Sequence, residues 1–207
     1  ATGLLGSGFA AGHPPRFWVN KISLSMPARH GVLRGLRIMQ ISDLHIGPVV
    51  NRNYLERARR VMLSQKADLL VVTGDIIDNN NYYLGLAQEF FSSIKGHFPL
   101  GIYGVLGNHD FIDNGEELSR SLTEVGVRML RNEAVRLSSA QGKWQLIGLD
   151  YPMHTWRESS SRAQVAARYL EQALAGRKEE NLPGIVLNHH PSDFSLFARH
   201  DIPLTLA

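Results

Sequence analysis

Four short apolar segments, each followed at once by a polar loop, constrain this chain more than any other feature. An unbroken apolar run of four to eight residues is typical of a strand that is covered on both faces. The runs lie at residues 36–41, 68–73, 101–106 and 184–187. Segments with helical periodicity alternate with these runs, at residues 53–66, 83–95, 116–125, 162–174 and 192–199. The sequence therefore predicts an α/β fold with a largely parallel sheet flanked by helices.

Other segments predict additional strands. Residues 17–26 partly alternate apolar and polar side chains, which suits an edge strand with one wet face. Three strand-like segments follow one another closely, which suggests antiparallel pairing among them; they are residues 128–130, 134–137 and 144–149. A last strand is expected to start at residues 203–206.

The composition excludes several kinds of site and partner. The 207 residues include no cysteine, so disulfides, thiolate metal ligands and a cysteine nucleophile are excluded. The net charge of +3 is small and scattered, and its densest group (Arg57, Arg59 and Arg60) lies on a predicted helix, where a solvated face explains it. We therefore expect no nucleic-acid partner.

The first residues differ from the rest of the chain. Residues 1–12 are small and apolar, without a charge, and no apolar run is long enough to span a bilayer. A disordered leader, the tail of a processed signal segment and the end of a membrane helix that begins upstream all fit this pattern. We expect residues 1–16 to be a flexible leader or membrane-anchor remnant, with membrane association through the region upstream of residue 17. Residues 17–207 are expected to form the folded domain.

The polar loops after the four buried strands hold the same classes of side chain. Their candidate ligands and neighbours are Asp43, His45, Asp75, Asn108, His109, Asp110, His189 and His190. Because ligands bind outside the carboxyl ends of parallel strands, we expect these groups to meet at one edge of the sheet. Carboxylate, imidazole and amide groups suit Mn, Fe or Zn, and a pair of such ions is the device used for in-line attack on phosphorus.

Local geometry leads to three more expectations at this edge. Asp43 and His45 are two residues apart, so on an extended segment both side chains point the same way and can reach one ion. The two oxygens of Asp75 can bridge two ions. Gly74 and Gly107 would let the backbone turn sharply beside the metal.

The ordered series D-x-H, G-D, G-N-H-D and H resembles the calcineurin-like metallophosphoesterase superfamily. The sequences around these motifs are most similar to a bacterial branch whose catalytic domain is often tied to the membrane. They read QISDLHIG, VVTGDIID, VLGNHD and LNHHPSDF. The resemblance covers about residues 36–207. It implies a four-layer α/β/β/α sandwich, with mixed sheets flanked by helices, and a protein that is cytoplasmic or membrane-associated.

The resemblance also implies a role for each metal ligand. Asp43 and His45 would bind a first divalent or trivalent ion, Asp75 would bridge both ions, and Asn108 and His189 would bind the second. His109 would contact the substrate phosphate and protonate or stabilise the leaving oxygen, and Asp110 would orient His109. Hydroxide activated by the two metals would attack, without a covalent enzyme intermediate.

One departure from the family pattern concerns the end of the chain. The family completes its site with G-H-x-H, whereas this sequence stops at residues 204–207, in what resembles the strand before that motif. We therefore expect residues 17–207 to be a catalytic domain that lacks the final motif.

The sequence leaves some choices open. The expected activity is metal-dependent hydrolysis of phosphate monoesters or diesters, with a lipid-linked or nucleotide substrate; a catalytically silent scaffold or a nuclease on the same fold are the alternatives. His190 is interpreted as structural or substrate-lining, with a functional role as the alternative. His154 is a candidate for the substrate pocket. Residues 78–81 are interpreted as a polar loop, with a role as ligands as the alternative.

Overall fold

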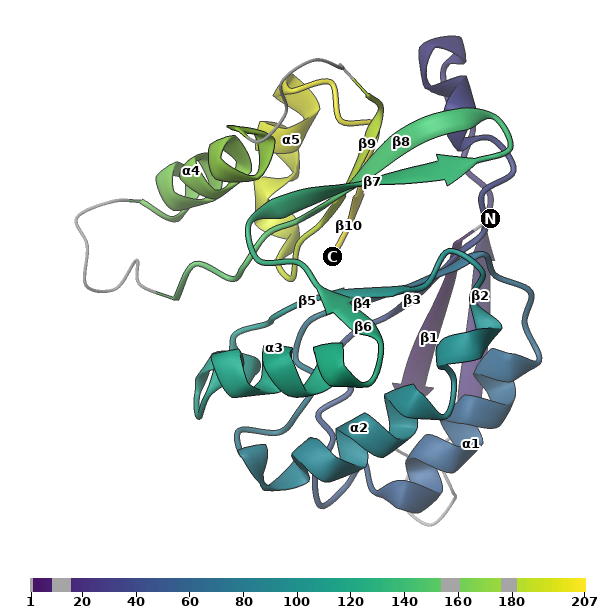
Figure 1. The fold of residues 1–207 in the computed structure, drawn as a ribbon, viewed down its shortest axis with the longest axis vertical. Coiled ribbons are helices and arrows are strands. Elements are labelled where there is room, and N and C mark those ends of the chain that lie inside the picture. Colours follow the sequence, from purple (N-terminus) through teal and green to yellow (C-terminus); the bar gives the residue numbers. More distant parts are fainter. Residues whose placement is uncertain (1, 9–15, 154–160, 176–181) are drawn as a thin grey trace.

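Two β-sheets lie face to face between two layers of helices (Figure 1). The structure is a computed structural model that describes residues 2–8, 16–153, 161–175 and 182–207. One outer layer contains α1 (Arg52–Leu63), α2 (Leu84–Ser92) and α3 (Gly115–Glu124), and the other contains α4 (Arg162–Ala175) and α5 (Phe194–Arg199). This arrangement confirms the predicted α/β/β/α sandwich.

The first sheet has six strands, in the order β2-β1-β3-β4-β5-β6. In chain order they are β1 (Thr2–Gly8), β2 (Arg16–Ile22), β3 (Ile38–Ile41), β4 (Leu69–Thr73), β5 (Ile102–Val105) and β6 (Val127–Met129). Strands β3 to β6 are parallel, with helices as crossovers, and β2 is the predicted edge strand.

Residues 2–8 differ from the flexible leader that the sequence predicted. They form β1, which pairs antiparallel with β2 and parallel with β3. The segment TGLLGSG has no clear strand periodicity of its own, so its place depends on hydrogen bonds to both neighbours. The boundary of the catalytic domain at residue 17 stays a prediction.

The second sheet has four strands, in the order β10-β9-β8-β7. They are β7 (Glu133–Ser139), β8 (Gly142–Gly148), β9 (Gly184–Leu187) and β10 (Leu204–Leu206). The antiparallel pairing predicted for residues 134–137 and 144–149 is confirmed in β7 and β8. It was wrong for residues 128–130, because β6 follows the crossover helix α3 and pairs parallel with β5 in the other sheet.

The layers are held by three apolar clusters, and the strands alternate between them. In β4, Leu69 and Val71 face the core between the sheets, whereas Leu70 and Val72 face the core under α1, α2 and α3. In β9, Val186 packs in the third cluster, under α4 and α5. A strand covered on both faces needs apolar side chains at every position, which explains the unbroken apolar runs.

Helix ends and short 3-10 turns shape the connections. The Asn51 side chain accepts hydrogen bonds from the backbone N–H groups of Asn53 and Tyr54, and Asn114 caps α3 in a similar way. The 3-10 helices are η1 (Ala28–Leu33), η2 (Asn81–Tyr83), η3 (Lys95–His97), η4 (His109–Phe111) and η6 (Pro191–Asp193). Among the helices of the described residues, none has the length and apolar character needed to cross a bilayer.

Candidate metal centre

The predicted metal ligands converge at the carboxyl ends of β3, β4, β5 and β9. Asp75 lies at the middle of the group: its Oδ2 is 3.6 Å from Nε2 of His45 and 3.5 Å from Nε2 of His189. Nε2 of His189 is also 3.1 Å from Oδ1 of Asn108, and Oδ1 of Asp43 is 4.0 Å from Nε2 of His45. Four loops that are distant in sequence therefore present their polar groups to one place.

These side chains offer two sets of candidate ligands for divalent metal. Two sets of ligand atoms each lie within 4.8 Å of one another: His45, Asp75 and His109 form one, and Asp43, Asp75 and His189 form the other. Asp75 belongs to both sets, as expected of a bridging carboxylate. The oxygen and imidazole donors suit Mn, Fe or Zn. The assignment of each residue to one ion stays a prediction, and the first set includes His109, which the sequence predicted not to bind metal.

The backbone of these loops is strained where it carries the ligands. Asp43, His45 and Asp75 have φ values of 52°, 45° and 51°, in the left-handed region that non-glycine residues rarely adopt. The Asp43 N–H donates to the Gly74 carbonyl over 3.0 Å, and the His45 N–H donates to the Asp75 carbonyl over 2.9 Å. The expected extended segment from Asp43 to His45 was therefore wrong, although their side chains do lie close together.

Glycine is required at two positions beside the ligands. Gly74 has a φ of 94°, and a Cβ atom there would lie 2.6 Å from the Gly107 backbone nitrogen and 2.6 Å from Nδ1 of His189. A Cβ atom on Gly107 would overlap the Asp75 carboxylate. The positive φ of Gly74 agrees with the sharp turn that was expected there; Gly107 does not have a positive φ, and its missing side chain lets the backbone approach Asp75 closely.

The electrostatics keep Asp75 ionised. Burial opposes the charge, but hydrogen bonds from His189 and from the His109 backbone N–H, 2.9 Å from Oδ1, outweigh it and hold the pKa of Asp75 below its usual range. Burial likewise disfavours a charged His189, but Asp75 and the Thr73 carbonyl, 2.8 Å from Nδ1, raise the pKa of that imidazole. A backbone carbonyl at one ring nitrogen is the usual partner of a metal-binding histidine, whose other nitrogen binds the ion.

Asp110 is buried and contacts backbone rather than His109. Its Oδ1 accepts from the N–H groups of Ile76 and Ile77 at 2.8 and 3.2 Å, and its Oδ2 accepts from Gly107 at 2.8 Å. Burial raises the pKa of Asp110 to about 6, against the opposing effect of these hydrogen bonds. Among the described hydrogen bonds, none joins Asp110 to the His109 ring, so the predicted partner was wrong. Asp110 ties the loop after β4 to the loop after β5.

The His109 ring is held by Asn79, a residue that the sequence analysis interpreted only as part of a polar loop. Nδ1 of His109 lies 2.5 Å from Oδ1 of Asn79, and Nε2 points toward the site, 4.0 Å from Oδ2 of Asp75. The ring also packs edge-on against His45, with centroids 4.7 Å apart. The only sequence signal for Asn79 was its place in the same loop as Asp75.

Aromatic and basic groups surround His189. The Tyr151 ring lies 5.9 Å from the His189 ring, and the Arg162 guanidinium stands 5.2 Å from the Tyr151 centroid. His190 accepts a hydrogen bond at Nδ1 from the Ser192 N–H, and burial and Arg162 lower its pKa. This contact supports the structural interpretation of His190. His154 lies outside the described residues.

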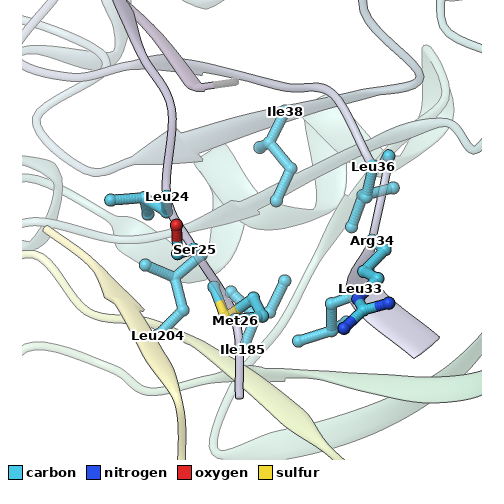
Figure 2. Close-up of a pocket in the computed structure, with 10 residues that line it drawn as sticks. Leu24, Ser25, Met26, Leu33, Arg34, Leu36, Ile38, Ile185 and Leu204 are labelled. Atoms are coloured by element: carbon cyan, nitrogen blue, oxygen red, sulfur yellow. The ribbon is translucent and has the colours of Figure 1, made fainter. Parts of the chain in front are cut away.

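A separate pocket lies at the other end of the strands (Figure 2). It has a volume of about 400 Å³ and is lined mainly by apolar side chains, among them Ile38 at the start of β3, Ile185 at the start of β9 and Leu204 at the start of β10. None of the predicted metal ligands lines it, so its shape does not bear on the metal centre.

Comparisons with known proteins agree with the geometry. The family model described as calcineurin-like phosphoesterase matches residues 36–204. Metallophosphoesterase YkoQ of Bacillus subtilis is 31% identical over 84% of this chain and 60% of its own length. A metallophosphoesterase of Aquifex aeolicus is 36% identical over 50% of this chain and 39% of its own length. UDP-2,3-diacylglucosamine pyrophosphatase LpxG of Chlamydia trachomatis is 35% identical over 45% of this chain and 28% of its own length.

Proposed function

Because the chain belongs to the calcineurin-like phosphoesterase family, we propose that it hydrolyses phosphate monoesters or diesters at the centre built around Asp75. The family uses divalent metals for phosphoester hydrolysis. The observation that carries the proposal is the convergence of carboxylate, imidazole and amide groups from four loops within a few ångströms of one carboxylate.

In this proposal Asp43, His45, Asp75, Asn108 and His189 would hold two cations. Such a pair, when bound, supplies Lewis acidity toward the phosphate oxygens and makes water a stronger nucleophile. The protein contributes the fixed positions of the donors: the left-handed backbone at Asp75, and the carbonyl that orients His189.

His109 is proposed to act on the leaving group. In hydrolysis a water oxygen forms a bond to phosphorus, the bond between phosphorus and the ester oxygen breaks, and that oxygen gains a proton. Nε2 of His109 faces the site beside Asp75, and a positioned imidazole is the commonest proton donor for such a step.

Exposed apolar side chains that follow the ligands along the chain support an amphiphilic substrate. One large apolar side chain, between 55% and 84% exposed, follows within a few residues of each ligand segment: Val49, Tyr82 in η2, Ile112, and Phe194 at the start of α5. LpxG, by its name, acts on a molecule with both a nucleotide and acyl chains. We therefore extend the proposal to phosphate esters that carry an apolar group, presented in a micelle or at a membrane surface.

Turnover assays test the proposal. The purified protein is expected to hydrolyse 4-nitrophenyl phosphate or bis(4-nitrophenyl) phosphate with added Mn, Fe or Zn, and to lose activity with a chelator. A diacyl phosphate ester in detergent micelles should be hydrolysed faster than its soluble head group. The absence of turnover with every metal and ester would contradict the proposed activity. An equal rate for the diacyl ester and its soluble head group would contradict only the proposal that the substrate is amphiphilic.

A further inference from the structure

The contact between Asn79 and His109 orients the imidazole ring. Oδ1 of Asn79 lies 2.5 Å from Nδ1 of His109, and because an amide oxygen only accepts hydrogen bonds, the contact favours a ring that carries a proton on Nδ1. This leaves Nε2 on the side of the ring that faces Asp75. The amide therefore holds the ring in one orientation: the charged imidazole can give its Nε2 proton to the leaving oxygen, and the neutral ring that remains keeps its proton on Nδ1.

The loop that carries Asn79 is anchored to the loop after β3. Ile77 forms a β-bridge with Ile46, and the Asp78 N–H donates to the Ile46 carbonyl over 3.0 Å. Asn79 itself has a left-handed φ of 52°.

The same loop is also anchored to the loop after β5. The Asn81 N–H donates to Oδ2 of Asp113 over 2.9 Å, and the Asn81 side chain donates to Oε2 of Glu117 over 3.0 Å. Asn79 is thus held between fixed neighbours, and its position does not depend on its own bond to His109.

Two nearby carboxylates do not hold the His109 ring. Asp110 accepts from the backbone of Gly107, Ile76 and Ile77. Among the hydrogen bonds of the described residues, none joins the Asp78 carboxylate to the His109 ring. An amide at position 79 holds the imidazole without adding another negative charge beside Asp43 and Asp75.

We propose that Asn79 is a positioning residue for His109 and that it sets the ring so that Nε2 faces the leaving oxygen of the substrate. The proposal rests on the proposed function for its kinetic consequence, whereas the tautomer and orientation of His109 can be measured without turnover.

The sharpest variant is Asn79→Gly, because glycine tolerates the left-handed φ while the amide is removed. Substitution of a residue that orients a histidine in a metal site typically lowers activity by about 10–100-fold. We expect kcat to fall in that range while KM and metal content stay near those of the wild type. The loss should be larger for phenyl phosphate than for 4-nitrophenyl phosphate, because the poorer leaving group depends more on a proton donor. Asn79→Asp keeps an acceptor and should restore part of the activity.

Asn80→Ala is the matched control. Its side chain accepts from the Tyr82 N–H and does not contact His109 in the described hydrogen bonds, so kcat should stay within about twofold of the wild type. A loss in Asn79→Gly that is equal for both esters and accompanied by loss of metal would show a merely structural role and overturn the proposal.

Nitrogen NMR of the imidazoles, on zinc-loaded and metal-free protein, separates this inference from the proposed function. His109, identified by its loss in His109→Ala, should show a protonated Nδ1 in the wild type and a mixture of tautomers in Asn79→Gly. Unchanged His109 signals in the variant would overturn the proposal even if the enzyme is active. If the protein shows the expected His109 signals but no turnover, Asn79 remains the positioning partner of His109. Only the proposed hydrolase activity would then be contradicted.

Discussion

The two ends of the parallel strands have opposite character. At the carboxyl ends lie charged and imidazole groups, whereas the amino ends of β3, β9 and β10 line a pocket whose side chains are mainly aliphatic. In the described part of the chain, four of the six non-glycine residues with positive φ lie in the two ligand loops after β3 and β4: Asp43, His45, Asp75 and Asn79. Strained backbone is thus concentrated where the chemistry is proposed, and the common core between the ends supports it.

The amino end is instead stabilised by packing and by ion pairs, of which Arg37–Asp68 is one. Nη2 of Arg37 lies 2.6 Å from Oδ1 of Asp68, and the Arg37 backbone N–H donates to Oδ2 of Asp68 over 2.9 Å. If the comparison is right, substitutions at the carboxyl end should change activity far more than stability, and substitutions at the amino end should do the reverse.

Asp75→Asn should have the largest effect on activity. The substitution removes one charge from the carboxylate shared by both sets of candidate ligands. Metal ions contribute several kcal/mol of transition-state stabilisation, so activity should fall by at least about 10²-fold. Metal analysis should find fewer than two ions per chain while circular dichroism stays unchanged. A variant that keeps both ions and full turnover would contradict the bridging role.

His109→Ala should reduce turnover nearly as much and leave the metals in place. Loss of a general acid typically costs about 10²–10⁴-fold. Turnover and metal content, measured on the same preparation, check this expectation. If the variant loses its metal, His109 is a ligand and the leaving-group role is wrong.

Ile185→Ala tests the opposite end. Ile185 is buried between the sheets and lines the pocket, and truncation of a buried isoleucine typically costs about 2–5 kcal/mol of unfolding free energy. Denaturant unfolding measures this loss, and Ile185→Val should cost only about 0.5–1.5 kcal/mol. The folded Ile185→Ala variant should keep a kcat near that of the wild type. A fall in kcat as large as that of His109→Ala would contradict the expectation that the amino end contributes to stability and not to activity.

Asp68→Asn should have the smallest effect, which depends on pH. The hydrogen bond from Arg37 lowers the pKa of Asp68, against the effect of partial burial. A carboxylate with a lowered pKa adds stability above its ordinary pKa of about 3.9, and this contribution is lost as the pH falls through the lowered value. The variant should be less stable by up to about 1 kcal/mol at pH 7 and nearly equal to the wild type in strong acid. Urea unfolding of the wild type and the variant at both pH values checks the direction of this pH dependence. An equal difference in unfolding free energy at the two pH values would contradict it.

Much of the site can be predicted because it depends on local patterns. The apolar runs mark buried strands, and a parallel sheet brings the ends of such strands to one edge, so Asp43, His45, Asp75, Asn108 and His189 are expected to meet without any further information. Local sequence patterns fail to predict the role of a residue when that role depends on contact with another segment of the chain. Gly107 is needed because Asp75 occupies the space of a Cβ atom, and Asp110 is a loop tie because three backbone N–H groups point at it.

The sequence by itself determined the strand–loop–helix alternation and the residues that gather at the centre. The alternation follows from the period of side chains along each segment, and the gathering follows because the loops after parallel strands meet at one edge of the sheet. The tertiary structure alone decided that residues 2–8 join the first sheet, that β6 pairs with β5, and that Asn79 rather than Asp110 holds His109. Each of these choices is a hydrogen bond between segments that are distant in sequence, and local periodicity carries no information about such partners.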